Sequence, residues 1–138
     1  MLQFYFLSIL LNTVTGLVLL FADKDDLDTL SEYKIPAIAR DETFRLVLGV
    51  LTSVTGFFKL LTAVRGDVPV IGDLLPALAG LAGGFTLLYE FYKTRSTLDE
   101  DDNLPPFIQK IVASKRYVGV ACLFAAGLHF LFPTILFL

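Results

Sequence analysis

The sequence is poor in the residue types that build catalytic and metal centres, since it contains one cysteine, one histidine and no tryptophan. A single Cys122 excludes a disulfide within one chain, and a single His129 excludes bis-histidine ligation of haem by one chain. Metal coordination also lacks ligands, because no aspartate or glutamate lies near the middle of an apolar span. We therefore expect no metal, no cofactor and no enzymatic activity.

Other functional classes lack their signatures as well. No glycine-rich phosphate-binding loop and no nucleophile elbow occurs in the sequence. The net charge of -3 comes from lysine, arginine and acidic residues that share the same segments, so no basic surface for nucleic acid is expected. Proton-driven export usually depends on a buried acid, which the apolar spans do not contain.

Long hydrophobic runs are present instead, in a chain that is 55% hydrophobic with a mean hydropathy of +0.70. The charged residues cluster into three blocks and leave four apolar spans, each long enough for a bilayer core of about 30 Å. We predict an all-α membrane protein with four transmembrane helices in a compact bundle, as a single domain over residues 1–138. The expected helices cover about 1–22, 44–64, 73–92 and 106–132.

The lysine and arginine residues predict how this bundle is oriented. They concentrate in the segments 23–43 and 93–114 and are absent from both tails, and such segments face the cytoplasm. We therefore expect both termini outside and a location in the bacterial cytoplasmic membrane. The first span lacks a basic stretch before it and a cleavage motif after it, so we interpret it as a retained helix.

Local signals refine the helix ends. Asp41 is placed to cap the second helix, and Pro76 falls in the first turn of the third helix, where its missing N–H costs little. The helical spacing of the apolar residues in 27–33 predicts a short interfacial helix. Glu90 lies near the cytoplasmic end of the third helix, close in sequence to Lys93, and is expected to be a solvated interface residue.

A seam of small and polar residues recurs in every apolar span. The phrase Val-Thr-Gly occurs at 14–16 and again at 54–56, and either an ancient duplication or a shared packing requirement explains the repeat. Lipid tails provide no hydrophobic drive between helices, so transmembrane helices pack through small residues and interhelical hydrogen bonds. Large apolar side chains are then expected to face lipid. The predicted packing residues are Gly16, Gly49, Gly56, Gly80, Gly84, Gly119 and Ala126.

Two ionisable residues, Lys59 and His129, lie within this seam. At 1.5 Å per residue they lie roughly 21 Å and roughly 18 Å from the inner ends of their spans, and therefore at similar depth in the outer half of the membrane. We expect a neutral His129 to accept a hydrogen bond from the ammonium group of Lys59. With Asn12 and Thr52 they form the candidate ligand-binding set, because intramembrane ionisable residues often mark functional sites.

Alternatives remain open for this pair. Lys59 can snorkel toward Asp67 or Asp73 near the outer surface, and His129 can be an ordinary interhelical hydrogen-bond partner. Together they can also bind an anionic head group or a quinone carbonyl. The threonines of the spans are expected to bond across helices or back to their own helix.

The segments RLVLGVLTSVTGFFKLL (45–61) and LLPALAGLAGGFTLL (74–88) resemble the first two helices of DoxX-like membrane proteins. The matching residues are Arg45, Gly49, Gly56 and Lys59 in the first segment and Gly83 and Gly84 in the second. This resemblance implies a four-helix integral membrane protein, in some cases an accessory subunit of a quinone-linked redox system. Ala79, Gly80 and Ala82 lie where the family often has a glutamate, and one additional helix precedes the matching region.

The functional prediction is a small, non-enzymatic membrane protein that acts as an accessory or structural subunit through helix packing. Its expected partners are the lipid bilayer and either further copies of the chain or a larger membrane protein, with no nucleic acid. The alternative predictions are a binder or carrier of a small lipophilic or anionic molecule, such as a lipid or quinone, and a DoxX-like redox accessory subunit.

Overall fold

The computed structural model describes residues 2–21, 37–61, 74–95 and 105–132, and these ranges are almost entirely helical. The predicted interfacial helix at 27–33 lies outside the described residues. The helices are α1 (Leu2–Phe21), the 3₁₀ helix η2 (Ala37–Arg40), α2 (Glu42–Leu61), α3 (Leu74–Arg95), α4 (Pro106–Ala113) and α5 (Lys115–Leu131).

The predicted start signals of two helices are present. Asp41 precedes α2, and its Oδ1 accepts a hydrogen bond of 2.8 Å from the backbone N–H of Phe44, which satisfies one of the unpaired donors at a helix N-terminus. Pro76 is the third residue of α3 and lies in its first turn. The sequence therefore located the start of α2 to within two residues and that of α3 to within one.

The fourth predicted helix is not continuous, which corrects the expectation of one helix over 106–132. Ser114 separates α4 from α5 with φ of -99° and ψ of 23°, which departs from α-helical geometry mainly in ψ. The N–H of Ser114 bonds to Lys110 and Ile111, whereas its carbonyl accepts bonds from Tyr117 and Val118. One helix thus ends at Ser114 and another starts there, although the local sequence contains neither proline nor glycine.

Three of the described helices are long and apolar enough to cross a membrane. They comprise Gln3–Phe21, Glu42–Leu61 and Leu74–Arg95. The break at Ser114 leaves α5 with 17 residues, or about 26 Å of helix, which is shorter than the three others. The all-helical fold is therefore confirmed, together with three candidate membrane spans.

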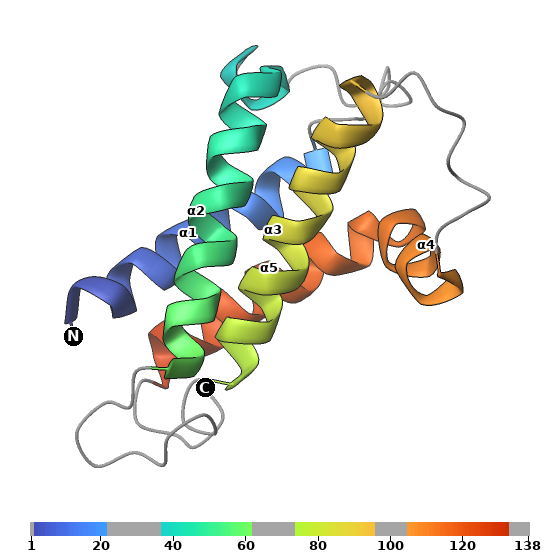
Figure 1. Ribbon diagram of the computed structural model, residues 1–138. Helices are drawn as coiled ribbons and strands as arrows, with labels where there is room; N and C mark the ends of the chain where they lie inside the picture. Colours follow the sequence, from blue (N-terminus) through green and yellow to red (C-terminus); the bar gives the residue numbers. More distant parts are fainter. Residues whose placement is uncertain (1, 22–36, 62–73, 96–104, 133–138) are drawn as a thin grey trace, which may run out of the picture.

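The helices form two antiparallel pairs that pack against one another. Figure 1 shows α2 beside α3, with α1 and α5 side by side across them and α4 apart to one side. The described ends of α1 and α5 meet where the hydroxyl of Tyr5 donates to the backbone carbonyl of His129 at 2.8 Å. Thr15 and Thr52 contact each other at the middle of the bundle. Each helix is consequently antiparallel to the next, in an up-down-up-down order for α1, α2, α3 and α5.

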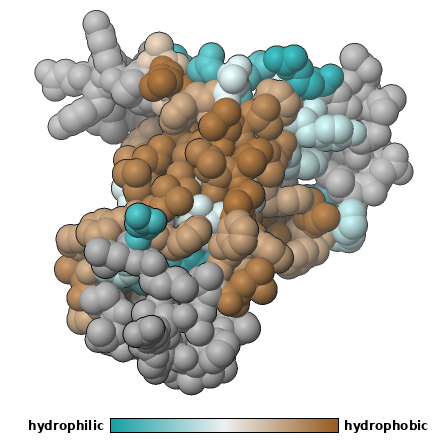
Figure 2. Space-filling model, turned by 60° about the vertical axis from the view of Figure 1, so that its left-hand side comes forward, coloured by the Kyte–Doolittle hydropathy of each residue, from teal (hydrophilic) through white to brown (hydrophobic). Residues whose placement is uncertain are grey.

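Large apolar side chains cover the outside of this bundle. Figure 2 shows a broad hydrophobic band on one face, with hydrophilic side chains gathered along its upper edge. Phe57 of α2 is 54% exposed and Phe124 of α5 is 63% exposed, and side chains of this size on a water-soluble protein would form an aggregation-prone patch. The exposed apolar surface therefore fits a lipid environment, as the three candidate spans do.

The small residues lie at the helix crossings. A Cβ atom on Gly16 would lie 2.8 Å from the carbonyl oxygen of Gly119, and one on Gly119 would lie 3.0 Å from that of Gly16, so these two glycines set the α1–α5 distance. Gly49 and Gly84 make the same reciprocal contact between α2 and α3. Such close backbone approach is how small residues stabilise helix pairs in lipid.

The other predicted seam residues lie at comparable contacts. A Cβ on Gly56 would approach the carbonyl oxygen of Ala77 to 2.9 Å, and one on Gly80 would lie 3.3 Å from Oδ1 of Asn12. Ala126 is 2% exposed. Gly83 was not among the predicted packing residues, yet a Cβ there would lie 2.7 Å from Sγ of Cys122. Helix α3 thus contacts each of α1, α2 and α5 through small residues.

Candidate functional site

A line of buried polar side chains follows the seam through the middle of the bundle. The hydroxyl oxygens of Thr15 and Thr52 lie 2.9 Å apart, and Thr52 also donates to the carbonyl of Leu48 in its own helix at 2.7 Å. Nδ2 of Asn12 donates across to the carbonyl of Pro76 at 3.0 Å. The expectation that these residues bond across helices or back to their own helix is confirmed. The buried polar residues of the seam are Ser8, Asn12, Thr15, Thr52, Thr55, Lys59, Thr86 and His129.

One end of the seam holds the Lys59–His129 pair. Nζ of Lys59 lies 2.9 Å from Nε2 of His129, and their exposed fractions are 3% and 1%. The ring of Tyr5 lies 4.6 Å from the imidazole ring, and Nζ of Lys59 is 5.6 Å from the centre of the Tyr5 ring. The predicted contact between Lys59 and His129 is present, and both side chains are buried rather than extended to the surface.

The chemistry of this pair follows from its short separation. Two positive charges 2.9 Å apart would repel each other by about 6 kcal/mol at an effective dielectric constant of 20. A stable contact therefore needs at least one neutral partner, as in an ammonium that donates to a neutral imidazole. Nζ of Lys59 also lies within about 6 Å of the centre of the Tyr5 ring, a distance at which an aromatic ring attracts an ammonium group.

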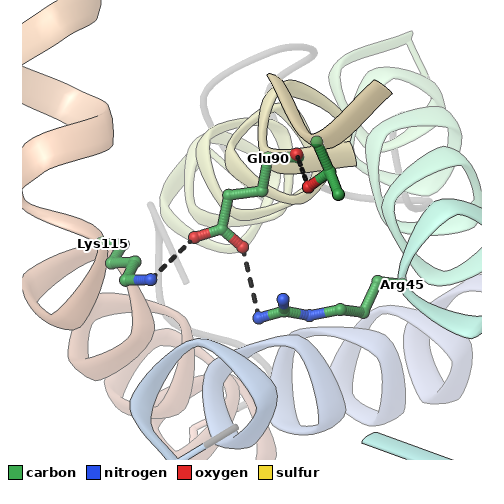
Figure 3. Close-up of polar contacts among 4 residues, drawn as sticks. Arg45, Glu90 and Lys115 are labelled. Atoms are coloured by element: carbon green, nitrogen blue, oxygen red, sulfur yellow. Dashed lines mark hydrogen bonds and ion pairs between the residues drawn. The ribbon is translucent and has the colours of Figure 1, made fainter. Parts of the chain in front are cut away.

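The opposite end of the seam holds an ion cluster formed by Arg45, Glu90 and Lys115, which we call the clasp. Oε2 of Glu90 lies 3.2 Å from Arg45, and Oε1 lies 3.0 Å from Nζ of Lys115. Figure 3 shows the two cations reaching Glu90 from opposite sides, Arg45 from α2 and Lys115 from α5. The expectation of a solvated Glu90 is wrong, because its side chain is 17% exposed and joins α3 to two other helices.

The clasp and the Lys59–His129 pair are separated by the same number of residues in α2 and in α5. Residues 45, 49, 52, 56 and 59 follow one helical stripe of α2, and residues 115, 119, 122, 126 and 129 follow one stripe of α5. In each helix fourteen residues, or roughly 21 Å, separate the clasp from the Lys59–His129 pair. This separation is shorter than the thickness of a bilayer core, which is about 30 Å.

The same helical spacing in the sequence indicates two site residues that were not predicted, Tyr5 and Glu90. Tyr5 lies three residues before Ser8 and continues the stripe of Ser8, Asn12 and Thr15 along α1. Glu90 continues the buried stripe of Gly83 and Thr86 along α3 in the same way. The nearness of Glu90 to Lys93 in sequence was therefore a weaker guide than its helical face.

An open apolar groove of about 520 Å³ lies on the outer side of α1, along Gln3, Phe6, Leu7 and Leu10. None of the four candidate ligand-binding residues lines it. The described residues also contain no group of three histidine, cysteine, aspartate or glutamate side chains that could hold a metal ion. Ligand binding by Lys59, His129, Asn12 and Thr52 stays a prediction.

Comparisons with other proteins place the chain in one family. Residues 1–129 match the model of an uncharacterised protein family, and the chain belongs to that family. It is similar to an uncharacterised protein from Treponema pallidum (strain Nichols), with 33% identity over 138 residues that make up the full length of both chains. No solved structure matches the chain.

Proposed function

We propose that this chain is a small, non-enzymatic integral membrane protein that crosses the bilayer four times and acts as an accessory or structural subunit through helix packing. The observation that carries this proposal is that the polar side chains lie inside the bundle and the large apolar side chains lie on its surface. The polar groups of the seam hydrogen bond to one another inside the bundle, whereas large leucine, valine and phenylalanine side chains point outward. Such a surface suits lipid or the apolar helices of a partner.

The charge distribution supports an orientation with the clasp toward the cytoplasm. Seven of the eight lysine and arginine residues in the described part of the chain lie at the clasp end, and Lys59 is the eighth. An excess of basic residues marks the cytoplasmic end of a membrane bundle. In a Cys122→Ser background, an impermeant thiol reagent should label Gln3→Cys but not Thr94→Cys in intact cells. Labelling of both positions or of Thr94→Cys alone would contradict this orientation.

The subunit role predicts a defined assembly. When the chain is extracted in a mild detergent, we expect either a stoichiometric complex with a larger membrane protein or a fixed number of its own copies, as measured by native mass spectrometry. Substitution of an outward phenylalanine, Phe57→Ala, should weaken that assembly while the fold persists. A monomer that retains no partner in several detergents and in nanodiscs would contradict the proposal.

A second candidate function is the binding of a small lipophilic or anionic molecule beside Lys59 and His129. The observation that favours it is the burial of two ionisable side chains against Tyr5, because ionisable groups within a membrane are costly and commonly functional. Native mass spectrometry of the wild type would then show a retained lipid or quinone that is lost from both Lys59→Leu and His129→Leu.

The same pair of variants separates a ligand site from a purely structural contact. Residues in direct contact typically show a coupling of about 0.5–3 kcal/mol in a double-mutant cycle, so the stability of the double variant should exceed the value expected from adding the two single effects. Coupling without any retained molecule would support the structural role alone. Two silent single variants would contradict both roles.

The DoxX resemblance supports a narrower form of the subunit role, in which the partner is a quinone-linked redox enzyme. Its support is limited to the motif residues of α2 and α3, among which Gly49, Gly56 and Gly84 lie at the α2–α3 crossing. Co-extraction with a protein that carries a redox cofactor would favour this form, and co-extraction with cofactor-free membrane proteins would exclude it.

A further inference from the structure

Helix α4 differs from the rest of the bundle in its placement. It contacts α3 and α5, and Figure 1 shows it to one side rather than in line with α5. Ile108 and Ile111 are half-buried, whereas Phe107, Gln109 and Lys110 are exposed. The helix is therefore held by one apolar side at the level of the clasp, and its other side chains extend away from the bundle.

The exposed side chains around Ser114 combine aromatic and basic character. Phe107 is 73% exposed and Tyr117 is 79% exposed, the largest exposed fractions among the large hydrophobic residues of the described part. Lys110 and Arg116 are exposed beside them, and residues 105–132 contain no aspartate or glutamate. Aromatic rings with lysine and arginine are characteristic of the boundary between the hydrocarbon core and the lipid head groups.

We propose that α4 and the first turn of α5 form a surface anchor that lies in the phospholipid head-group layer. The rings of Phe107 and Tyr117 enter the part of the hydrocarbon core that borders the head groups, and Lys110 and Arg116 bind lipid phosphates. The anchor continues the lipid-facing surface of α5, so the proposal rests on the membrane-spanning role of that helix. The acidic run 99–102 precedes α4 in the sequence, so the segment as a whole carries no net positive charge. Direct contact of Lys110 and Arg116 with lipid phosphates, rather than net charge, therefore supplies the binding. The anchor therefore forms on zwitterionic as well as anionic lipid.

The absence of tryptophan from the chain permits a direct test of depth. The single-tryptophan variants Phe107→Trp and Phe124→Trp would be reconstituted in phosphatidylcholine vesicles that contain lipids with a quencher near the head group or deep in the acyl chain. Phe124 is exposed in the middle of α5 and reports whether that helix crosses the membrane. Thr94→Trp, at an exposed position near the end of α3, provides a reference outside the hydrocarbon.

For the anchor, we expect blue-shifted emission from Phe107→Trp, strong quenching by the shallow label and weak quenching by the deep label. Added Lys110→Glu and Arg116→Glu substitutions should shift this emission to the red and reduce the shallow quenching.

Quenching of Phe107→Trp by aqueous iodide but not by lipid labels, with Phe124→Trp quenched by the deep label, would overturn the anchor alone. Strong deep quenching of Phe107→Trp would overturn it by placing α4 within the span. Loss of deep quenching at Phe124→Trp would contradict the spanning role itself.

Discussion

Replacement of Gly84 by alanine is expected to separate α2 from α3 and to lower the stability of the folded protein by about 1–3 kcal/mol, the usual cost of overpacking a tightly packed contact. The added methyl group would lie 2.7 Å from the carbonyl oxygen of Gly49 and 2.7 Å from the backbone nitrogen of Ser53. Backbone atoms within a helix cannot move away as the end of a side chain can, so the two helices must shift as a whole. The measurement is the free energy of unfolding in mixed micelles of a mild detergent and sodium dodecyl sulfate.

Gly127→Ala is the matched control for this substitution. Gly127 also lies inside a helix, but a Cβ there meets no atom within 4 Å, and glycine in a helix costs about 0.5–1 kcal/mol relative to alanine. The same chemical change should therefore destabilise at Gly84 and leave stability unchanged or raised at Gly127. Equal effects at the two positions would show that the α2–α3 crossing is not formed by close backbone contact.

The contrast between these two glycines also shows what the sequence could predict. The seam residues were found from helical spacing together with side-chain size, because a face that packs in lipid must be small or polar wherever two backbones approach. Gly127 lies within an apolar helix, as Gly16 and Gly56 do, but one residue beyond the buried stripe of α5. The face of the helix, rather than the presence of a glycine, therefore decides whether that position packs.

The contact of Lys59 with His129 was predictable for a similar physical reason. Two antiparallel steps of the chain place α2 and α5 in the same direction, so equal distances from their inner ends mean equal depth. The seam then restricts both side chains to the inside of the bundle. The contact with Tyr5 follows from the same stripe in α1, but the stripe had been defined by small and polar side chains alone, so an aromatic residue was not included in it.

The division between α4 and α5 could not be predicted from local sequence. The segment around Ser114 contains no glycine or proline, and a continuous helix satisfies its backbone equally well. The bend depends instead on tertiary contacts, because Ile108 and Ile111 are half-buried beside the bundle while Lys115 reaches Glu90 at 3.0 Å. A straight helix would lose either the packing of the two isoleucines or the ion pair of Lys115. Residues 106–132 alone contain no pattern that indicates these two tertiary contacts.

Glu90→Gln is expected to produce the other large loss of stability, about 1–3 kcal/mol. Removing one partner of a buried ion pair can cost about 3–5 kcal/mol, and partial exposure reduces this value here, since the side chains of Arg45 and Lys115 are 16% and 32% exposed. The variant keeps the shape of the side chain but leaves two cations facing a neutral amide. A second substitution, Lys115→Gln, should recover part of the loss because it removes the excess charge.

Glu42→Gln provides the comparison that isolates the clasp. Glu42 pairs with Arg95 at 3.3 Å, but the two side chains are 48% and 66% exposed, so this change should cost less than about 1 kcal/mol. Interaction with the helix dipole alone predicts the opposite order, because Glu42 lies in the first turn of α2, where an acid is favourable, and Glu90 lies toward the C-terminus of α3, where an acid is unfavourable. A larger loss of stability for Glu42→Gln would therefore show that interaction with the helix dipoles outweighs the ion pairs of the clasp. A larger loss for Glu90→Gln, with recovery in the double variant, would assign Glu90 to holding α2, α3 and α5 together.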